Sequence, residues 1–265
     1  HDAAKIRMVC PSIVLAVGAP GMGKTNFGKH LIYQMAHVFN TGLILCPNPS
    51  ARLEWDIVQK PFVVDFYHRD LVEAFMIDQE ANGFPPAFLI FDDCLGEAEF
   101  RDPIIAKLCT QYRKYNVWIW FGLQYLAHVL PPVIRQCVQF VYAFRTLEQR
   151  ATKLLWDSFF SMFFKNSVSL MFALMLLPTK HHCYYLDVRE TKLNIVHSPE
   201  HVPEFVLKWE VAPEPDKAEE EEQMDDEQRN EGIRLLEIAK TFDDDDPIRN
   251  TRRIVPSAEP PQKKK

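Results

Sequence analysis

Short apolar runs alternate with segments of helical periodicity over roughly the first 190 residues. Apolar runs bounded by Gly, Pro or Asp indicate buried strands, and apolar positions spaced by three and four indicate amphipathic helices. The expected strands span residues 13–17, 43–46, 62–66, 87–93, 117–123, 137–144 and 182–188. The expected helices are one that follows residue 25 and reaches Val38, and the segments 70–81, 103–112, 148–164 and 167–177. This alternation predicts an α/β fold with a mostly parallel central sheet and helices on both faces.

The composition changes after residue 212. Residues 213–265 carry 10 Lys/Arg and 16 Asp/Glu, which accounts for the whole net charge of −6. Acidic runs at 219–222 and 243–246 and three terminal lysines do not favour a packed core. We therefore expect one folded domain over residues 1–212 and a disordered, charged tail over 213–265, with a short amphipathic helix at 227–240. A solvated arm is the first interpretation of this tail; binding of a partner or mimicry of DNA is the alternative.

One Phe-, Met- and Leu-rich stretch, residues 154–178, resembles a membrane span in composition. Asp157 and Lys165 interrupt it, and the uncharged piece at 166–179 is shorter than the roughly 18 to 20 residues that a bilayer crossing needs. We expect a buried helix pair and no contact with a membrane.

The cysteines and histidines do not have the spacing of metal ligands or of a disulfide framework. The six cysteines are far apart, without a C-x-x-C pair, and most lie in apolar stretches, which favours buried free thiols in a reducing compartment. His181 and His182 are adjacent on an expected strand and would point to opposite faces, which argues against a shared metal.

One stretch matches the pattern G-x-x-x-x-G-K-[ST] and lies between an expected strand and an expected helix. Its residues are Gly18, Ala19, Pro20, Gly21, Met22, Gly23, Lys24 and Thr25. Glycines let successive backbone N–H groups point into one concavity, which can hold phosphate oxygens. Lys24 would reach the β- and γ-phosphates of ATP, and the Thr25 hydroxyl would coordinate Mg²⁺. The start of the next helix also favours phosphates electrostatically.

Polar residues end two of the other expected strands. Asp92 is placed to enter the shell of the Mg²⁺ ion, and Asp93 is placed to orient or deprotonate the attacking water. Gln124 follows the strand at 117–123, and we expect its amide near the γ-phosphate. The alternatives are a helix cap for the carboxylates and an ordinary strand-end polar residue for Gln124; the phosphate-binding loop favours the functional interpretation.

Together these motifs resemble the viral genome-packaging ATPases of the FtsK/HerA superfamily, which belong to the RecA-like (ASCE) division of P-loop NTPases. Members occur in nucleocytoplasmic large DNA viruses, virophages and Polinton-like elements. The resemblance covers about residues 12–190 and rests on the loop at 18–25, the segments 88–93, 112–116 and 130–135, and Gln124. It implies an extra strand between the loop strand and the acidic strand. Asp93 stands where the wider superfamily commonly has glutamate.

The resemblance implies an ATP-driven translocase that packages double-stranded DNA into a preformed capsid at its vertex. It further implies a homo-oligomeric ring of five or six subunits, acting at sites of virus assembly in the host cytoplasm or nucleus. In such a ring a neighbouring subunit can supply an arginine to the γ-phosphate; Arg135 is the first candidate and Arg145 the second, an ordinary surface arginine being the alternative. A cellular-type translocase or helicase of the same superfamily, or a non-motor capsid assembly or scaffold protein, are the competing functions.

Overall fold

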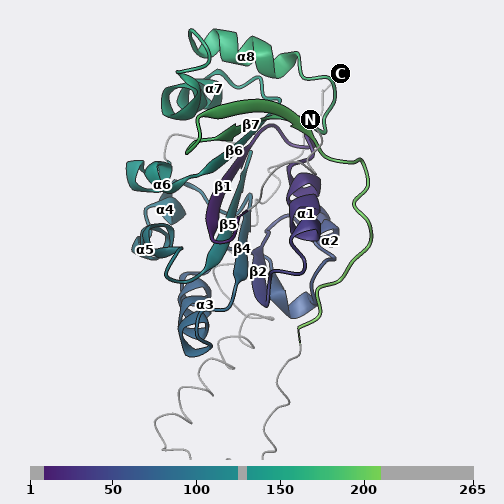
Figure 1. Ribbon diagram of the computed structural model, residues 1–265, viewed down its shortest axis with the longest axis vertical. Helices are drawn as coiled ribbons and strands as arrows, with labels where there is room; N and C mark the ends of the chain where they lie inside the picture. The colour runs from purple at the N-terminus through teal and green to yellow at the C-terminus, as the bar shows by residue number, and fades with distance from the viewer. Residues whose placement is uncertain (1–8, 125–129, 210–265) are drawn as a thin grey trace, which may run out of the picture. The chain divides into compact units, whose positions relative to one another are not determined.

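The computed structural model describes residues 9–124 and 130–209, which contain an eight-stranded sheet (Figure 1). The strands are β1 (Ser12–Val17), β2 (Thr41–Leu45), β3 (Val63–Val64), β4 (Ala87–Asp92), β5 (Val117–Leu123), β6 (Phe140–Phe144), β7 (His182–Asp187) and β8 (Lys192–His197). Their order is β3-β2-β4-β5-β1-β6-β7-β8. Strands β1 to β6 pair in parallel, and β7 and β8 are added antiparallel at one edge. The predicted α/β class with a mostly parallel sheet is confirmed; the expected tail and its helix at 227–240 lie outside the described residues.

Helices cover both faces of this sheet (Figure 1). The helices are α1 (Lys24–Gln34), α2 (Pro49–Glu54), α3 (Arg69–Ala81), α4 (Glu97–Phe100), α5 (Pro103–Gln111), α6 (Pro132–Cys137), α7 (Gln149–Leu155) and α8 (Ser167–Met175), with a 3-10 turn η2 (Lys60–Phe62) and a π-helical turn η3 (Trp156–Phe160). Side chains of α1 and of the segment around α2 pack into one apolar cluster, and those of α3, α5 and α6 pack into a second cluster on the opposite face. The predicted two-sided covering of the sheet is therefore present.

The central strands β1, β4 and β5 are buried along their whole length. Successive residues of β1 belong to opposite clusters: Val14 and Ala16 to the one with α1, and Ile13, Leu15 and Val17 to the other. Because both faces are covered by helices, neither face needs polar residues, and these strands read as continuous apolar runs.

The strand order brings three chain segments to one edge of the sheet. β5 lies between β1 and β4, which is the extra strand implied by the resemblance. Val17, the last residue of β1, pairs with Leu123, and Asp92 pairs with Gly122. The carboxyl ends of the three parallel strands therefore lie side by side, the place where open α/β sheets bind ligands.

Three short helices, α2, α4 and α6, are absent from the sequence-based expectations. Helix α2 follows Asn48, whose side-chain oxygen accepts hydrogen bonds from the backbone N–H groups of Ser50 and Ala51. Helices α2 and α6 both carry a proline in their first turn. From the sequence, Pro49 indicates the end of the strand at 43–46, and the segment 130–135 leads into the strand at 137–144. Proline is also favoured at the first position of a helix.

The strands at the two edges of the sheet differ from expectation. The expected strand at 62–66 is mostly wrong, because the turn η2 precedes it and only Val63–Val64 pairs with β2. Strand β8 was not predicted. It forms a hairpin with β7 through a turn that contains no glycine, where Thr191 adopts a positive φ of 52°.

The apolar segment at 154–178 is not the fully buried helix pair that we expected. Leu170 and Leu174 of α8 face the core, but Phe172 is 56% exposed and Leu176 is 81% exposed. Composition alone indicated burial on every side, whereas α8 contacts the core along one side only. Across residues 9–124 and 130–209 the chain has no helix with both the length and the apolar character of a membrane span.

Gly42 in β2 allows close contact with Phe88 in β4. A Cβ atom on Gly42 would lie 2.4 Å from Cζ of the Phe88 ring, which is fully buried. We expect Gly42→Ala to lower the free energy of unfolding by about 1–3 kcal/mol, because the ring has no room to retreat. Denaturant titration measures this change.

Phe88→Leu provides the control for the clash. In that background Gly42→Ala should cost clearly less than in the natural chain, because the ring that it meets is gone. Strictly additive costs in the double-mutant cycle would show that another contact is responsible.

Candidate nucleotide-binding site

The loop between β1 and α1 is held in place by both neighbouring strands. The backbone N–H of Gly18 donates to the carbonyl of Leu123 over 3.2 Å, and that of Ala19 donates to the carbonyl of Arg145 over 3.0 Å. Gly21 and Gly23 have φ angles of 72° and 86°, the left-handed region that favours glycine. A Cβ on Gly21 would meet no atom within 4 Å, so the loop faces open space. The sequence-predicted phosphate loop therefore has the backbone that a phosphate cradle requires.

The Lys24 side chain is folded back over this loop. Its Nζ donates to the carbonyl oxygens of Gly18 at 2.9 Å and Ala19 at 3.2 Å. Burial lowers the pKa of Lys24, while the nearby Asp93 and Asp92 act in the opposite direction. The ammonium group thus lies at the centre of the loop, and its hydrogen-bond partners are neutral carbonyl oxygens. A negatively charged phosphate oxygen can take their place as a stronger hydrogen-bond acceptor.

Asp92, at the end of β4, is 1% exposed. Its Oδ2 accepts hydrogen bonds from Thr25 Oγ1 at 2.9 Å and from the Trp55 indole Nε1 at 2.9 Å. Burial raises its pKa to about 6; the hydrogen bond from Trp55 opposes this shift. Its other oxygen, Oδ1, is buried and has no hydrogen-bond partner among the described residues.

These two residues fit a magnesium ion. Thr25 and Asp92 supply a hydroxyl and a carboxylate 2.9 Å apart, with one carboxylate oxygen left over. Mg²⁺ in nucleotide sites uses one or two protein oxygens plus phosphates and waters rather than a cage of side chains. The described residues contain no group of three or more His, Cys, Asp or Glu that could hold a metal.

Asp93 and Gln124 form a second polar pair beside the loop. Gln124 Nε2 donates to Asp93 Oδ2 at 2.6 Å, and the Asp93 backbone adopts a positive φ of 54° as it leaves β4. Burial raises the pKa of Asp93, and Lys24 and the amide of Gln124 partly counter that rise. The structure therefore brings the two predicted water-orienting residues into contact.

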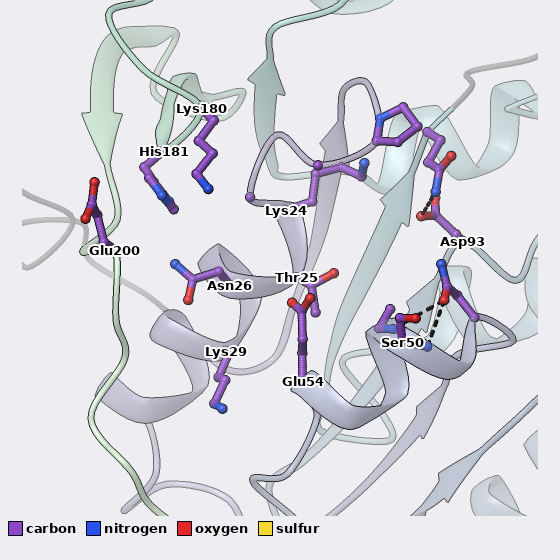
Figure 2. A pocket seen from close by; sticks show the side chains of 16 residues that line it. Lys24, Thr25, Asn26, Lys29, Ser50, Glu54, Asp93, Lys180, His181 and Glu200 are labelled. Carbon is purple, nitrogen blue, oxygen red and sulfur yellow. Dashed lines mark hydrogen bonds between the residues drawn. The ribbon is translucent and has the colours of Figure 1, made fainter.

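A cavity of about 530 Å³ lies over the loop (Figure 2). Its lining residues are Pro20, Gly21, Gly23, Lys24, Thr25, Asn26, Lys29, Asn48, Ser50, Ala51, Glu54, Asp93, Gln124, Lys180, His181 and Glu200. The contributions of α2, of the turn before β7 and of the segment after β8 are not predicted from the sequence. Only Asn48 could have been predicted from the sequence, because it follows β2. The carboxyl end of β2 lies at the same edge of the sheet as the carboxyl ends of β1 and β4.

The two candidate arginines do not line this cavity. Arg135, on α6, donates through Nη1 to Ser158 Oγ at 3.2 Å. Arg145 follows β6 and donates through Nη2 to the carbonyl of Leu177. Within the described chain, neither guanidinium belongs to the site of its own subunit.

The raised pKa of Asp92 has a consequence for stability. The carboxyl group of Asp92 binds its proton more tightly in the folded state than in the unfolded chain. The ionised carboxylate therefore lowers the free energy of unfolding above about pH 6. This loss becomes smaller as the pH falls towards 3.8. Asp92→Asn should therefore raise the free energy of unfolding by about 1–2 kcal/mol at pH 8 without Mg²⁺ and nucleotide. Denaturant titrations at pH 8 and pH 5 measure this gain, which should shrink by about half at pH 5.

Glu73→Gln is the matched control, because Glu73 is an exposed carboxylate on α3. It should leave the unfolding free energy unchanged at both pH values. A gain for Asp92→Asn that is absent at pH 8, or that grows at pH 5, would contradict the assignment of this cost to Asp92.

No family model and no curated protein matches this sequence. Solved structures do match it. The genome packaging NTPase B204 from Sulfolobus turreted icosahedral virus 2, in complex with AMPPCP, is 18% identical with a TM-score of 0.52; the match covers 72% of this chain and 98% of that chain. B204 from Sulfolobus turreted icosahedral virus, a DNA-packaging ATPase, is 17% identical with a TM-score of 0.53 over 73% of this chain and 100% of that chain.

A bacterial secretion protein shares the architecture as well. The cytoplasmic domain of the Thermomonospora curvata Type VII secretion ATPase EccC is 14% identical with a TM-score of 0.51, over 72% of this chain but 26% of that chain. At such identities the likeness concerns the fold. The described chain has the fold of the P-loop NTPases, in the form shared by viral genome-packaging NTPases and the Type VII secretion ATPase.

Proposed function

We propose that this chain is an ATP-driven translocase that packages double-stranded viral DNA into a preformed capsid. The observation that carries the proposal is that Lys24, Thr25, Asp93 and Gln124 line one cavity at the carboxyl edge of the sheet. Asp92 joins this group through its hydrogen bond from Thr25. Phosphoryl transfer depends mainly on positioning and charge stabilisation, and this group provides both.

Each member has a role in hydrolysis. The loop amides and Lys24 bind the phosphates, and Thr25 and Asp92 hold Mg²⁺, which when bound offsets the charge of the phosphate oxygens. Asp93 accepts the proton of the attacking water, a task for which a pKa raised by burial is suited. The amide of Gln124 holds the Asp93 carboxylate in place and contacts the same water.

Packaging is favoured over other uses of the fold by the extent of the structural matches. The viral packaging NTPases align over 98% or more of their length, whereas the secretion ATPase aligns over 26% of its own chain. By analogy with those proteins we assign duplex DNA and the capsid vertex as partners, and sites of virus assembly in the host cytoplasm or nucleus as the location.

A homo-oligomeric ring of five or six subunits is part of the proposal. Among the described residues, the cavity lining contains two lysines besides Lys24 but no arginine, which supports an arginine supplied to the γ-phosphate by a neighbouring subunit. Arg135 remains the first candidate for this role and Arg145 the second.

ATP hydrolysis measured with and without duplex DNA tests the function. We expect DNA to accelerate hydrolysis several-fold, because a loaded motor turns over faster than an idle one. Lys24→Ala should reduce the DNA-stimulated rate by about 100-fold or more, since it removes a charge that stabilises the transferred phosphoryl group.

The outcome separates the competing functions. Hydrolysis that ignores DNA would favour a non-motor assembly protein, and ATP binding without turnover would do the same. A cellular-type translocase or helicase would also respond to DNA, so packaging additionally requires DNA uptake into purified capsids.

A mixing experiment tests the arginine in trans. Subunits with Arg135→Ala keep Asp93 but lack the arginine, and subunits with Asp93→Ala keep the arginine but lack the base. Mixed rings should therefore recover part of the hydrolysis that each variant alone has lost. Unchanged melting temperatures control for the loss of the Arg135 contact to Ser158, and mixtures as inactive as their components would exclude Arg135.

A further inference from the structure

One end of the cavity carries polar side chains that the phosphate chemistry does not use. Asn26 lies in the first turn of α1, Lys180 and His181 lie in the turn before β7, and Glu200 follows β8. We call these four residues the β7-side cluster. Figure 2 shows Lys180, His181 and Glu200 across the loop from Asp93.

His181 is the least satisfied member of this cluster. Its side chain is 9% exposed, and its Nδ1 is buried without a hydrogen-bond partner in the described chain. The same nitrogen would lie 3.3 Å from a Cβ on Gly23, so the ring lies directly against the phosphate loop. Buried polar atoms are almost always paired, and an unpaired one on a residue that lines a cavity points to a ligand atom.

The backbone of His181 is held in place independently of any ligand. Its main-chain N–H donates to Thr179 Oγ1 at 3.3 Å, and its carbonyl accepts from the backbone N–H of Ser198 at 3.1 Å. Asn26 Nδ2 in turn donates to the carbonyl of Pro199 at 2.8 Å. The cluster is therefore tied both to the start of α1 and to the segment after β8.

The orientation of a bound triphosphate follows from the phosphate chemistry. Its terminal phosphate belongs beside Asp93 and Gln124, and its metal beside Thr25 and Asp92. The phosphate nearest the nucleoside then lies towards the first turn of α1, so the nucleoside lies on the side of the loop where Asn26 is. The β7-side cluster occupies that side (Figure 2).

The charges at this end suit a neutral ligand group joined to a phosphate. Burial lowers the pKa of His181, and Lys180 lowers it further, so the imidazole is neutral at pH 7. A neutral imidazole can donate or accept a hydrogen bond, as its tautomer allows. In Figure 2 the Lys180 side chain extends into the space between His181 and Lys24. From there its charge is available to the phosphate nearest the nucleoside.

We propose that the β7-side cluster binds the nucleoside end of the nucleotide, with His181 Nδ1 hydrogen-bonded to the nucleoside and Lys180 paired with the adjoining phosphate. This inference rests on the proposed nucleotide site and adds a specificity-determining residue to it. His181 distinguishes a nucleoside triphosphate from bare polyphosphate, whereas the loop and Lys24 respond to both.

Equilibrium binding of Mg²⁺-ATP and of Mg²⁺-tripolyphosphate tests this. His181→Ala should weaken ATP by roughly three- to tenfold, the value of one hydrogen bond, and leave tripolyphosphate within about twofold. His181→Asn, whose amide can lie where Nδ1 lies, should recover part of the lost ATP affinity. Lys180→Ala should weaken both ligands, more strongly at low salt.

Two controls make the result specific. His37→Ala removes an exposed histidine beyond the end of α1 and should change neither affinity. Lys24→Ala should weaken ATP and tripolyphosphate alike. Circular dichroism and melting temperature establish that each variant is folded.

The possible failures can be told apart. If the natural protein binds neither ligand, the nucleotide site itself is wrong and this inference is wrong with it. If it binds both, and His181→Ala leaves their affinity ratio unchanged, the site stands and the role of His181 is overturned.

Discussion

A carboxylate buried between strands imposes the constraint on which the rest of the site depends. Asp92 is 1% exposed, and an ionised carboxylate at such burial is costly unless hydrogen bonds compensate it. Thr25 and Trp55 supply those bonds from the start of α1 and from the residue that ends α2. The requirement to satisfy one charge therefore fixes two helices on one face of the sheet against the end of β4, and with them the position of the phosphate loop.

Glycine at position 122 makes this burial sterically possible. Gly122 of β5 pairs with Asp92, and a Cβ there would lie 2.7 Å from Asp92 Oδ1. Without that side chain, β5 can lie against β4 and still leave space for the carboxylate. The strand then ends at Leu123, and Gln124 reaches Asp93. The metal ligand of the proposed chemistry thus depends on the absence of a side chain at position 122.

The sequence predicts the parts of the fold that local patterns encode. The runs that form β1, β4 and β5 are continuous because these strands are buried on both faces, and the loop residues occupy fixed positions in a short motif. The same reasoning places Asp92, Asp93 and Gln124 at one edge of the sheet. Edge elements carry weaker signals: β3 is two residues long, and β8 follows a turn without glycine.

The site residues that the sequence did not predict were missed for a different reason. Trp55 contacts Asp92, and His181 contacts the phosphate loop, only through packing between segments far apart in the chain. Nothing in their local sequence indicates these contacts. The apolar helix α8 shows the opposite error, since composition indicated burial while only Leu170 and Leu174 face the core. Local periodicity identifies an element, but tertiary packing decides which of its side chains are covered.

The hydrogen bond from Trp55 to Asp92 also makes the protein its own spectroscopic probe. The indole donates directly to the carboxylate that we assign to the metal, so neutralisation of that charge changes the electric field across the ring and hence its emission. Trp118 and Trp120 are buried in the same apolar cluster, and Trp55 is distinguished from them by its bond to an ionisable partner. Substitution of the other tryptophans by phenylalanine would leave a single optical signal for the occupancy of Asp92, without any added label.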